Sequence, residues 1–143
     1  MKAVFRSVLA VIAGFVAATV VMMIVETVNG RYLFPELGKA AEGVTDREVI
    51  RTLFAGAPVG ALLVVLAGWT LGSFFGGLVA AWIGRRSPVG HALAVGAVLT
   101  ICGIANNLML PPPLWFWCAS LIVLLPAAYA GGRRVRRPMA SLR

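Results

Sequence analysis

Charged residues are scarce in this chain of 143 residues, and their scarcity excludes several classes of protein. Only 13% of the residues are charged, well below the roughly 25% that is usual in soluble domains. The chain has one histidine and five acidic residues, which gives little support to a histidine-based metal or haem site or to a Ser-His-Asp set. We therefore expect no metal, no cofactor and no catalytic residues, and a protein that is not an enzyme.

Cysteine is also rare. Cys102 and Cys118 both lie inside apolar runs, and neither belongs to a CxxC motif or a Cys/His cluster. Counted back from the turn between their two predicted helices, they fall at different depths, so we expect no disulfide between them. We interpret both as small residues that face the core or the lipid.

Apolar sequence is what the chain has in abundance, with 60% hydrophobic residues and a mean hydropathy of +0.92. Four runs are long enough to cross a membrane as helices, over about residues 7–28, 58–84, 89–110 and 114–131. The charged start MKAVFR resembles a signal peptide, but the uncharged stretch from Val8 to Val25 exceeds a signal core and no suitable cleavage site follows. We predict a single all-α transmembrane domain over residues 1–143, folded as a four-helix bundle.

The long polar connection between the first two runs contains helix signals of its own. FPELGKAAEG offers Pro35 as a helix start and Gly43 as a stop. In TDREVIRTLF, the spacing of Thr45 and Glu48 predicts a capping box. The apolar residues after it share one helical face, which predicts a short amphipathic helix on the membrane surface or packed on the bundle. They are Val49, Ile50, Leu53 and Phe54.

Basic residues at the ends of the runs predict the orientation. Nine of the thirteen lie in the N-terminus, the Arg85–Arg86 turn and the C-terminal tail, and four lie in the first connection beside four acidic residues. Because cytoplasmic loops are rich in Lys and Arg, we expect both termini in the cytoplasm. The tail GGRRVRRPMASLR has no aromatic residues to stack on bases, so we expect it to meet lipid headgroups and no nucleic acid.

Small residues recur at intervals of four along the second run, broken only at Val64. They are Gly56, Gly60, Gly68, Gly72, Gly76, Ala80 and Gly84. Such a face lets two helix backbones approach closely in lipid, so it predicts a partner helix. The first run, with Ala10, Gly14 and Ala18, is the first candidate. A second copy of the chain is the alternative, which would make the protein a homo-oligomer or part of a larger membrane complex.

Polar residues gather at one depth, near the ends of the first and third runs. They are Glu26, Asn29, Asn106 and Asn107. This cluster predicts either a site for a cation or small polar ligand, or a structural hydrogen-bond network. Glu26 could also pair with Arg31 or Arg51. Trp69 lies near the middle of its run, where tryptophan is unusual, and we expect it to have a packing or pocket role.

The stretches ETVN, GWTLGSFFGGLVAAWI and NNLMLPPPLWFW resemble small four-span bacterial inner-membrane proteins that are known mainly as uncharacterised sequences. The resemblance covers most of the chain and implies no activity. Two functions therefore stay open, and an enzyme that acts on lipid-soluble substrates is a less favoured third. One is an accessory subunit or self-associating scaffold, which the small-residue stripe favours. The other is a carrier or channel for a small solute or ion, with Thr70, Ser73 and Thr100 as deeper polar steps.

Overall fold

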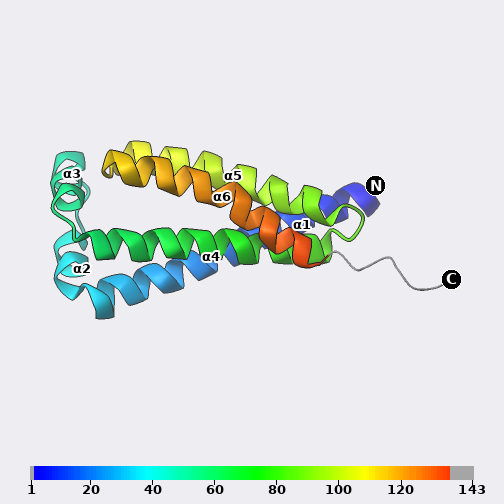
Figure 1. Ribbon diagram of the computed structural model, residues 1–143, viewed down its shortest axis with the longest axis horizontal. Coiled ribbons are helices and arrows are strands. Elements are labelled where there is room, and N and C mark those ends of the chain that lie inside the picture. The colour runs from blue at the N-terminus through cyan, green and yellow to red at the C-terminus, as the bar shows by residue number, and fades with distance from the viewer. Residues whose placement is uncertain (1, 136–143) are drawn as a thin grey trace.

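Helices make up most of the computed structural model, which describes residues 2–135 (Figure 1). No strand occurs within these residues. Four helices are long and three are short. In chain order they are α1 (Lys2–Val28), the π-helical turn η1 (Asn29–Leu33), α2 (Pro35–Ala41), α3 (Arg47–Ala55), α4 (Val59–Ile83), α5 (Pro88–Met109) and α6 (Leu114–Arg134).

Each long helix is long and apolar enough to cross a membrane, which is the make-up of a multi-pass membrane protein. The first apolar stretch is longer than the sequence pattern predicted, because η1 continues α1 and the whole stretch covers Val4–Leu33. The other three helices begin and end within a few residues of the predicted bounds. Most of the basic C-terminal tail, residues 136–143, lies outside the described residues, and so does its predicted contact with lipid.

Among the long helices, α4 contacts all three others, most extensively α1 and then α6, while α5 packs mainly on α6 and α4. Figure 1 shows α2 and α3 together beyond one end of the long helices. We call this the α2/α3 end. The N-terminus, the turn between α4 and α5 and the end of α6 lie at the opposite end, which we call the terminal end.

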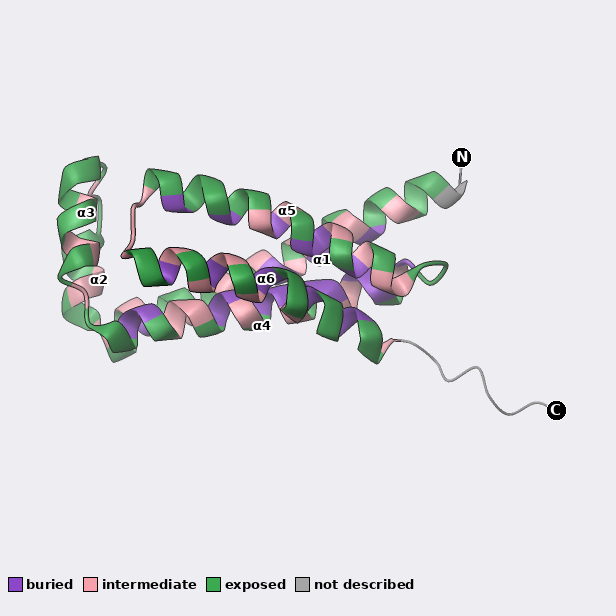
Figure 2. Cartoon of the chain, turned by 45° about the horizontal axis from the view of Figure 1, so that its top comes forward, coloured by how far each residue is buried: buried purple, intermediate pink, exposed green. Residues whose placement is uncertain are grey.

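The seam between α1 and α4 is built from small residues, as the stripe predicted. A Cβ on Gly72 would lie 2.6 Å from Met22 Cγ and 2.8 Å from the carbonyl oxygen of Ala18. A Cβ on Gly76 would lie 2.7 Å from the carbonyl oxygen of Gly14. No real side chain tolerates such distances without a shift, so the two backbones touch. The stripe therefore has its partner inside the chain, and buried positions follow α4 where it meets its neighbours (Figure 2).

The ends of the stripe depart from the prediction. Gly56 caps the end of α3 and is not part of α4. Gly60 is exposed and lies beside the ring of Phe34, and Gly84 lies against His91. The part of the stripe that packs on α1 therefore runs from Gly68 to Ala80.

A second close seam, between α4 and α6, was not predicted. A Cβ on Gly77 would collide with the backbone of Ala128, and one on Gly131 would collide with the carbonyl of Phe74. Ser73 supports the same seam, because its buried hydroxyl donates to the Leu124 carbonyl at 2.6 Å. Helix α4 thus has bare glycine surface on two sides, and α1 and α6 each cover one.

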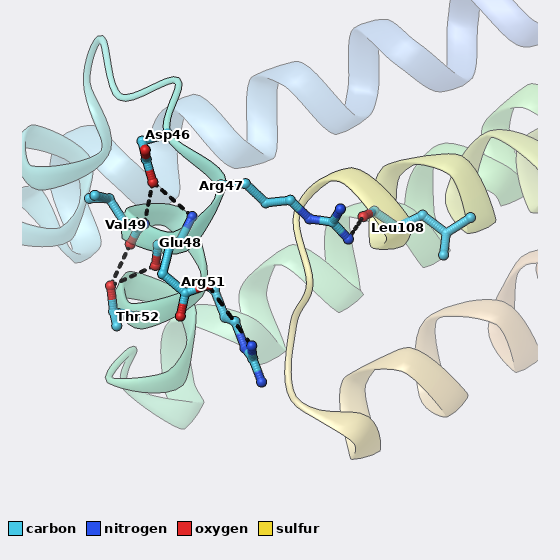
Figure 3. A network of polar contacts seen from close by, with 7 residues as sticks. All are labelled: Asp46, Arg47, Glu48, Val49, Arg51, Thr52 and Leu108. Carbon is cyan, nitrogen blue, oxygen red and sulfur yellow. Dashed lines mark hydrogen bonds and ion pairs between the residues drawn. The ribbon is translucent and has the colours of Figure 1, made fainter.

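The first connection forms helices where the sequence indicated them, but the predicted capping residue was wrong. Helix α2 starts at Pro35, and Gly43 beyond its end has a φ of 72°. Helix α3 is capped by Asp46 and not by Thr45: one carboxylate oxygen accepts from the backbone N–H groups of Glu48 at 2.9 Å and Val49 at 3.1 Å (Figure 3). A carboxylate satisfies two free N–H groups and also opposes the positive end of the helix dipole.

Helix α3 is tied to the end of α5 by Arg47, whose guanidinium donates to the carbonyl of Leu108 at 2.8 Å (Figure 3). Its apolar residues Ile50, Leu53 and Phe54 are half-buried, whereas Val49 is exposed. No residue of α2 or α3 is fully buried. These two helices therefore form a cap over one end of the long helices, and the cap has no buried core of its own.

Candidate functional site

A cavity of about 390 Å³ lies at the α2/α3 end, lined by residues from every helical segment. Its volume falls in the usual range for small-molecule sites, about 300–1,000 Å³. Most of its wall is apolar, with Phe34, Ile50, Leu53, Phe54 and Val65 among the lining residues. All four residues of the predicted polar cluster line it as well: Glu26, Asn29, Asn106 and Asn107.

Glu26 and Trp69 form one side of the cavity. The indole Nε1 of Trp69 donates to Glu26 Oε1 at 3.1 Å, which links α4 to α1. The Trp69 ring is buried and packs edge-on against Phe116, with 5.9 Å between ring centroids. Trp69 thus has the packing and pocket role that its depth suggested. Among the described residues, Glu26 forms an ion pair with neither Arg31 nor Arg51, and Arg51 Nη1 lies 3.9 Å from Glu48 Oε2 instead.

Asn29 enters the cavity wall from the first residue of η1. Its side chain is buried, with 6% exposed, and Nδ2 donates to the Ala61 carbonyl at 3.1 Å. A carbonyl can only accept, so this bond fixes which side-chain atom is nitrogen. Oδ1 is consequently an acceptor, and it has no partner within the described residues.

Asn107 is the most enclosed polar residue of the lining, with 1% of its surface exposed. Its Nδ2 donates to Ser120 Oγ at 3.1 Å, and Ser120 in turn donates to the Trp117 carbonyl at 3.1 Å. Because the serine proton is already used, Ser120 must accept from Asn107. With this assignment the Oδ1 of Asn107 also lacks a partner within residues 2–135.

Two residues that line one cavity each have an unpaired, enclosed acceptor, and such atoms carry a physical cost. A buried acceptor without a partner destabilises a protein by about 1–3 kcal/mol, and most native buried polar atoms are paired. Asn106 differs from its neighbour, since it lines the cavity but is exposed. The cluster thus divides into two buried amides, Asn29 and Asn107, and two exposed residues, Glu26 and Asn106.

The carrier hypothesis named the hydroxyl groups of Thr70, Ser73 and Thr100 as polar groups deeper in the membrane. Each of these hydroxyls donates a hydrogen bond to a backbone carbonyl. Thr70 donates to Leu66 at 2.8 Å and Thr100 donates to Gly96 at 2.8 Å, each within its own helix. Ser73 donates across to α6. None of the three lines the cavity, so the unpaired polar atoms stay confined to the α2/α3 end.

The terminal end has a different chemistry. Arg6 donates to the Ile83 carbonyl at 2.8 Å, and His91 Nδ1 lies 2.7 Å from the Ser87 carbonyl oxygen. Away from the terminal end, the two cysteines are free and exposed on α5 and α6. Within the part of the chain that the structure describes, no group of three or more His, Cys, Asp and Glu residues could hold a metal ion.

Comparisons with known proteins add no assignment: no family model, no curated protein and no solved structure matches the chain.

Proposed function

We propose that the protein is a non-enzymatic membrane component that binds a ligand in the cavity at the α2/α3 end. The observation that carries this proposal is Asn107, whose Oδ1 is enclosed and unpaired. A purely structural network would pair its buried acceptors, because an unpaired one weakens the fold. A ligand that donates to Oδ1 would remove that cost when it binds.

Binding is better supported than transport. A carrier or channel needs polar groups that can exchange partners along the path, and the hydroxyls of Thr70, Ser73 and Thr100 are already bonded to carbonyls. The carrier remains the second candidate because Glu26 lines the cavity. It predicts a flux across reconstituted vesicles that depends on Glu26.

The role we favour is that of an accessory subunit in a bacterial inner membrane with both termini in the cytoplasm. The charge distribution supports this orientation, and it puts the cavity at the extracytoplasmic face. Self-association as a scaffold has less support than the stripe suggested, because α1 covers Gly68, Gly72 and Gly76 within the chain. A second copy would have to use another surface.

The test compares molecules that purify with the full chain. Wild type, Asn107→Leu and the control Thr100→Val are extracted from native membranes in mild detergent, and bound small molecules are identified by mass spectrometry. Thr100→Val removes a hydroxyl from the same helix outside the cavity. We expect one compound to accompany wild type and the control in near-stoichiometric amount and to be lost from Asn107→Leu. Identical compounds in all three preparations would overturn the proposal.

A further inference from the structure

We infer that the cavity at the α2/α3 end selects an organic ammonium ion, that is, a protonated primary amine attached to an apolar group. This inference rests on the proposed binding function and names the class of ligand. It starts from the distribution of hydrogen-bond donors and acceptors around the cavity.

The buried side-chain atoms of the lining that have no partner within the described residues are acceptors. Each asparagine Nδ2 donates one of its two N–H groups, to Ala61 or to Ser120, and the Trp69 N–H donates to Glu26. What remains is Oδ1 of Asn29 and Oδ1 of Asn107, together with the Glu26 carboxylate, which has room for further donors. A ligand must therefore bring donors. A ligand whose polar group only accepts, such as a carboxylate, would leave these oxygens unpaired.

The charge of the lining favours a cation. Glu26 is the one ionisable residue among the described residues that line the cavity. The nearby guanidinium of Arg47 is directed at the Leu108 carbonyl. The rings of Trp69 and Phe116 belong to the same wall, and aromatic faces attract ammonium groups. A primary ammonium combines a positive charge with three N–H donors, which is the chemistry that these acceptor groups favour.

The rest of the wall determines what the ammonium carries. A bare Ca²⁺ or Mg²⁺ needs a shell of oxygen ligands, and the apolar side chains from α2, α3 and α6 cannot supply one. A volume of 390 Å³ corresponds to about a dozen water-sized groups. That space suits a short alkyl or aromatic group behind the ammonium.

Two sources can supply this chemistry: a free amphipathic amine, or the ethanolamine headgroup of a membrane lipid. Both present a primary ammonium next to apolar material. The inference concerns the shared group, and the experiment separates the sources.

The test uses the full chain in phosphatidylcholine nanodiscs with hexylammonium, hexyltrimethylammonium and hexanoate as probes, and binding is measured by calorimetry. We expect hexylammonium to bind at least about tenfold more tightly than hexyltrimethylammonium, which has the charge but no N–H donor, because a hydrogen bond to a charged group is lost for each acceptor. Hexanoate should not bind measurably. Equal affinities for the two cations, or binding of hexanoate alone, would overturn the inference.

Variants locate the site. Glu26→Gln and Asn107→Leu should each weaken hexylammonium binding about tenfold or more. The control is Thr27→Val, beside Glu26 on α1, because the Thr27 hydroxyl is exposed and bonded to Met23 within its own helix. It should leave the affinity unchanged. Equal affinity in wild type, Glu26→Gln and Asn107→Leu would place the amine elsewhere and contradict the inference.

Repeating the titration with phosphatidylethanolamine in the nanodisc distinguishes the sources. Competition that grows with the fraction of this lipid identifies its headgroup, and an unchanged affinity identifies a free amine; both outcomes uphold an ammonium ligand. If no probe binds while a compound still depends on Asn107 in the purification experiment, the ligand class is wrong and the binding function stands. If both experiments fail, both proposals fall.

Discussion

The seam between α1 and α4 and the cavity at the α2/α3 end use the same two helices in opposite ways. Along the seam, Gly72 and Gly76 have no side chains, so the backbones of α1 and α4 come into contact. At the cavity, Glu26 of α1 and Trp69 of α4 line an open space together with residues of the other helices. In lipid, helices gain from close packing because apolar burial provides no driving force. A region that forgoes this gain and also leaves acceptors unpaired is more consistent with binding than with packing.

The largest loss of thermal stability is expected from a substitution at the centre of the seam between α1 and α4. Gly72→Leu places a bulky side chain against Met22 and the Ala18 carbonyl. Overpacking of this kind costs about 1–3 kcal/mol, so thermal unfolding in detergent should begin at clearly lower temperature. Leu71→Ala is the matched control, since Leu71 is exposed with 47% of its surface accessible. Equal losses in the two variants would show that the seam is not a close contact.

A somewhat smaller effect is expected at the seam between α4 and α6. Gly131→Ala adds a single methyl group where the Phe74 carbonyl already occupies the space, which should cost roughly 1 kcal/mol or more. Ala130→Leu adds more volume at the neighbouring exposed position and should change the unfolding temperature little. If Ala130→Leu proves the more harmful of the two, the assigned face of α6 is wrong.

The smallest effect concerns the cap that covers the cavity. Asp46→Ala removes the acceptor for the N–H groups of Glu48 and Val49 and should destabilise α3 by about 0.5–2 kcal/mol. Because α3 has no fully buried residue, the loss should appear as faster hydrogen exchange in α3 and not as global unfolding. Thr45→Ala should have no such effect. Faster exchange in Thr45→Ala alone would restore the capping box that the sequence suggested.

The sequence predicted the four apolar helices and the α1–α4 seam because both depend on local patterns: run length, and small residues spaced by one helical turn. It missed the α4–α6 seam, since Gly77 and Gly131 do not belong to a repeat within one helix. The depth of Glu26, Asn29, Asn106 and Asn107 was enough to predict that they share a region. The unpaired state of the two Oδ1 atoms was not predictable, because it depends on Ala61 and Ser120, which approach from other helices.

The most direct test of the central claim, that the cavity is built for a ligand and not for stability, is thermal unfolding of Asn107→Leu beside wild type in the absence of added ligand. Leucine has nearly the shape of asparagine and removes the unpaired oxygen, while Ser120 keeps its bond to the Trp117 carbonyl. We predict that Asn107→Leu unfolds at the same temperature as ligand-free wild type or at a higher one. The gain in unfolding free energy should be at most about 1–3 kcal/mol, and hexylammonium binding should be lost. A clear drop in the unfolding temperature with hexylammonium binding unchanged would contradict the account, because Asn107 would then hold the helices together and bind nothing.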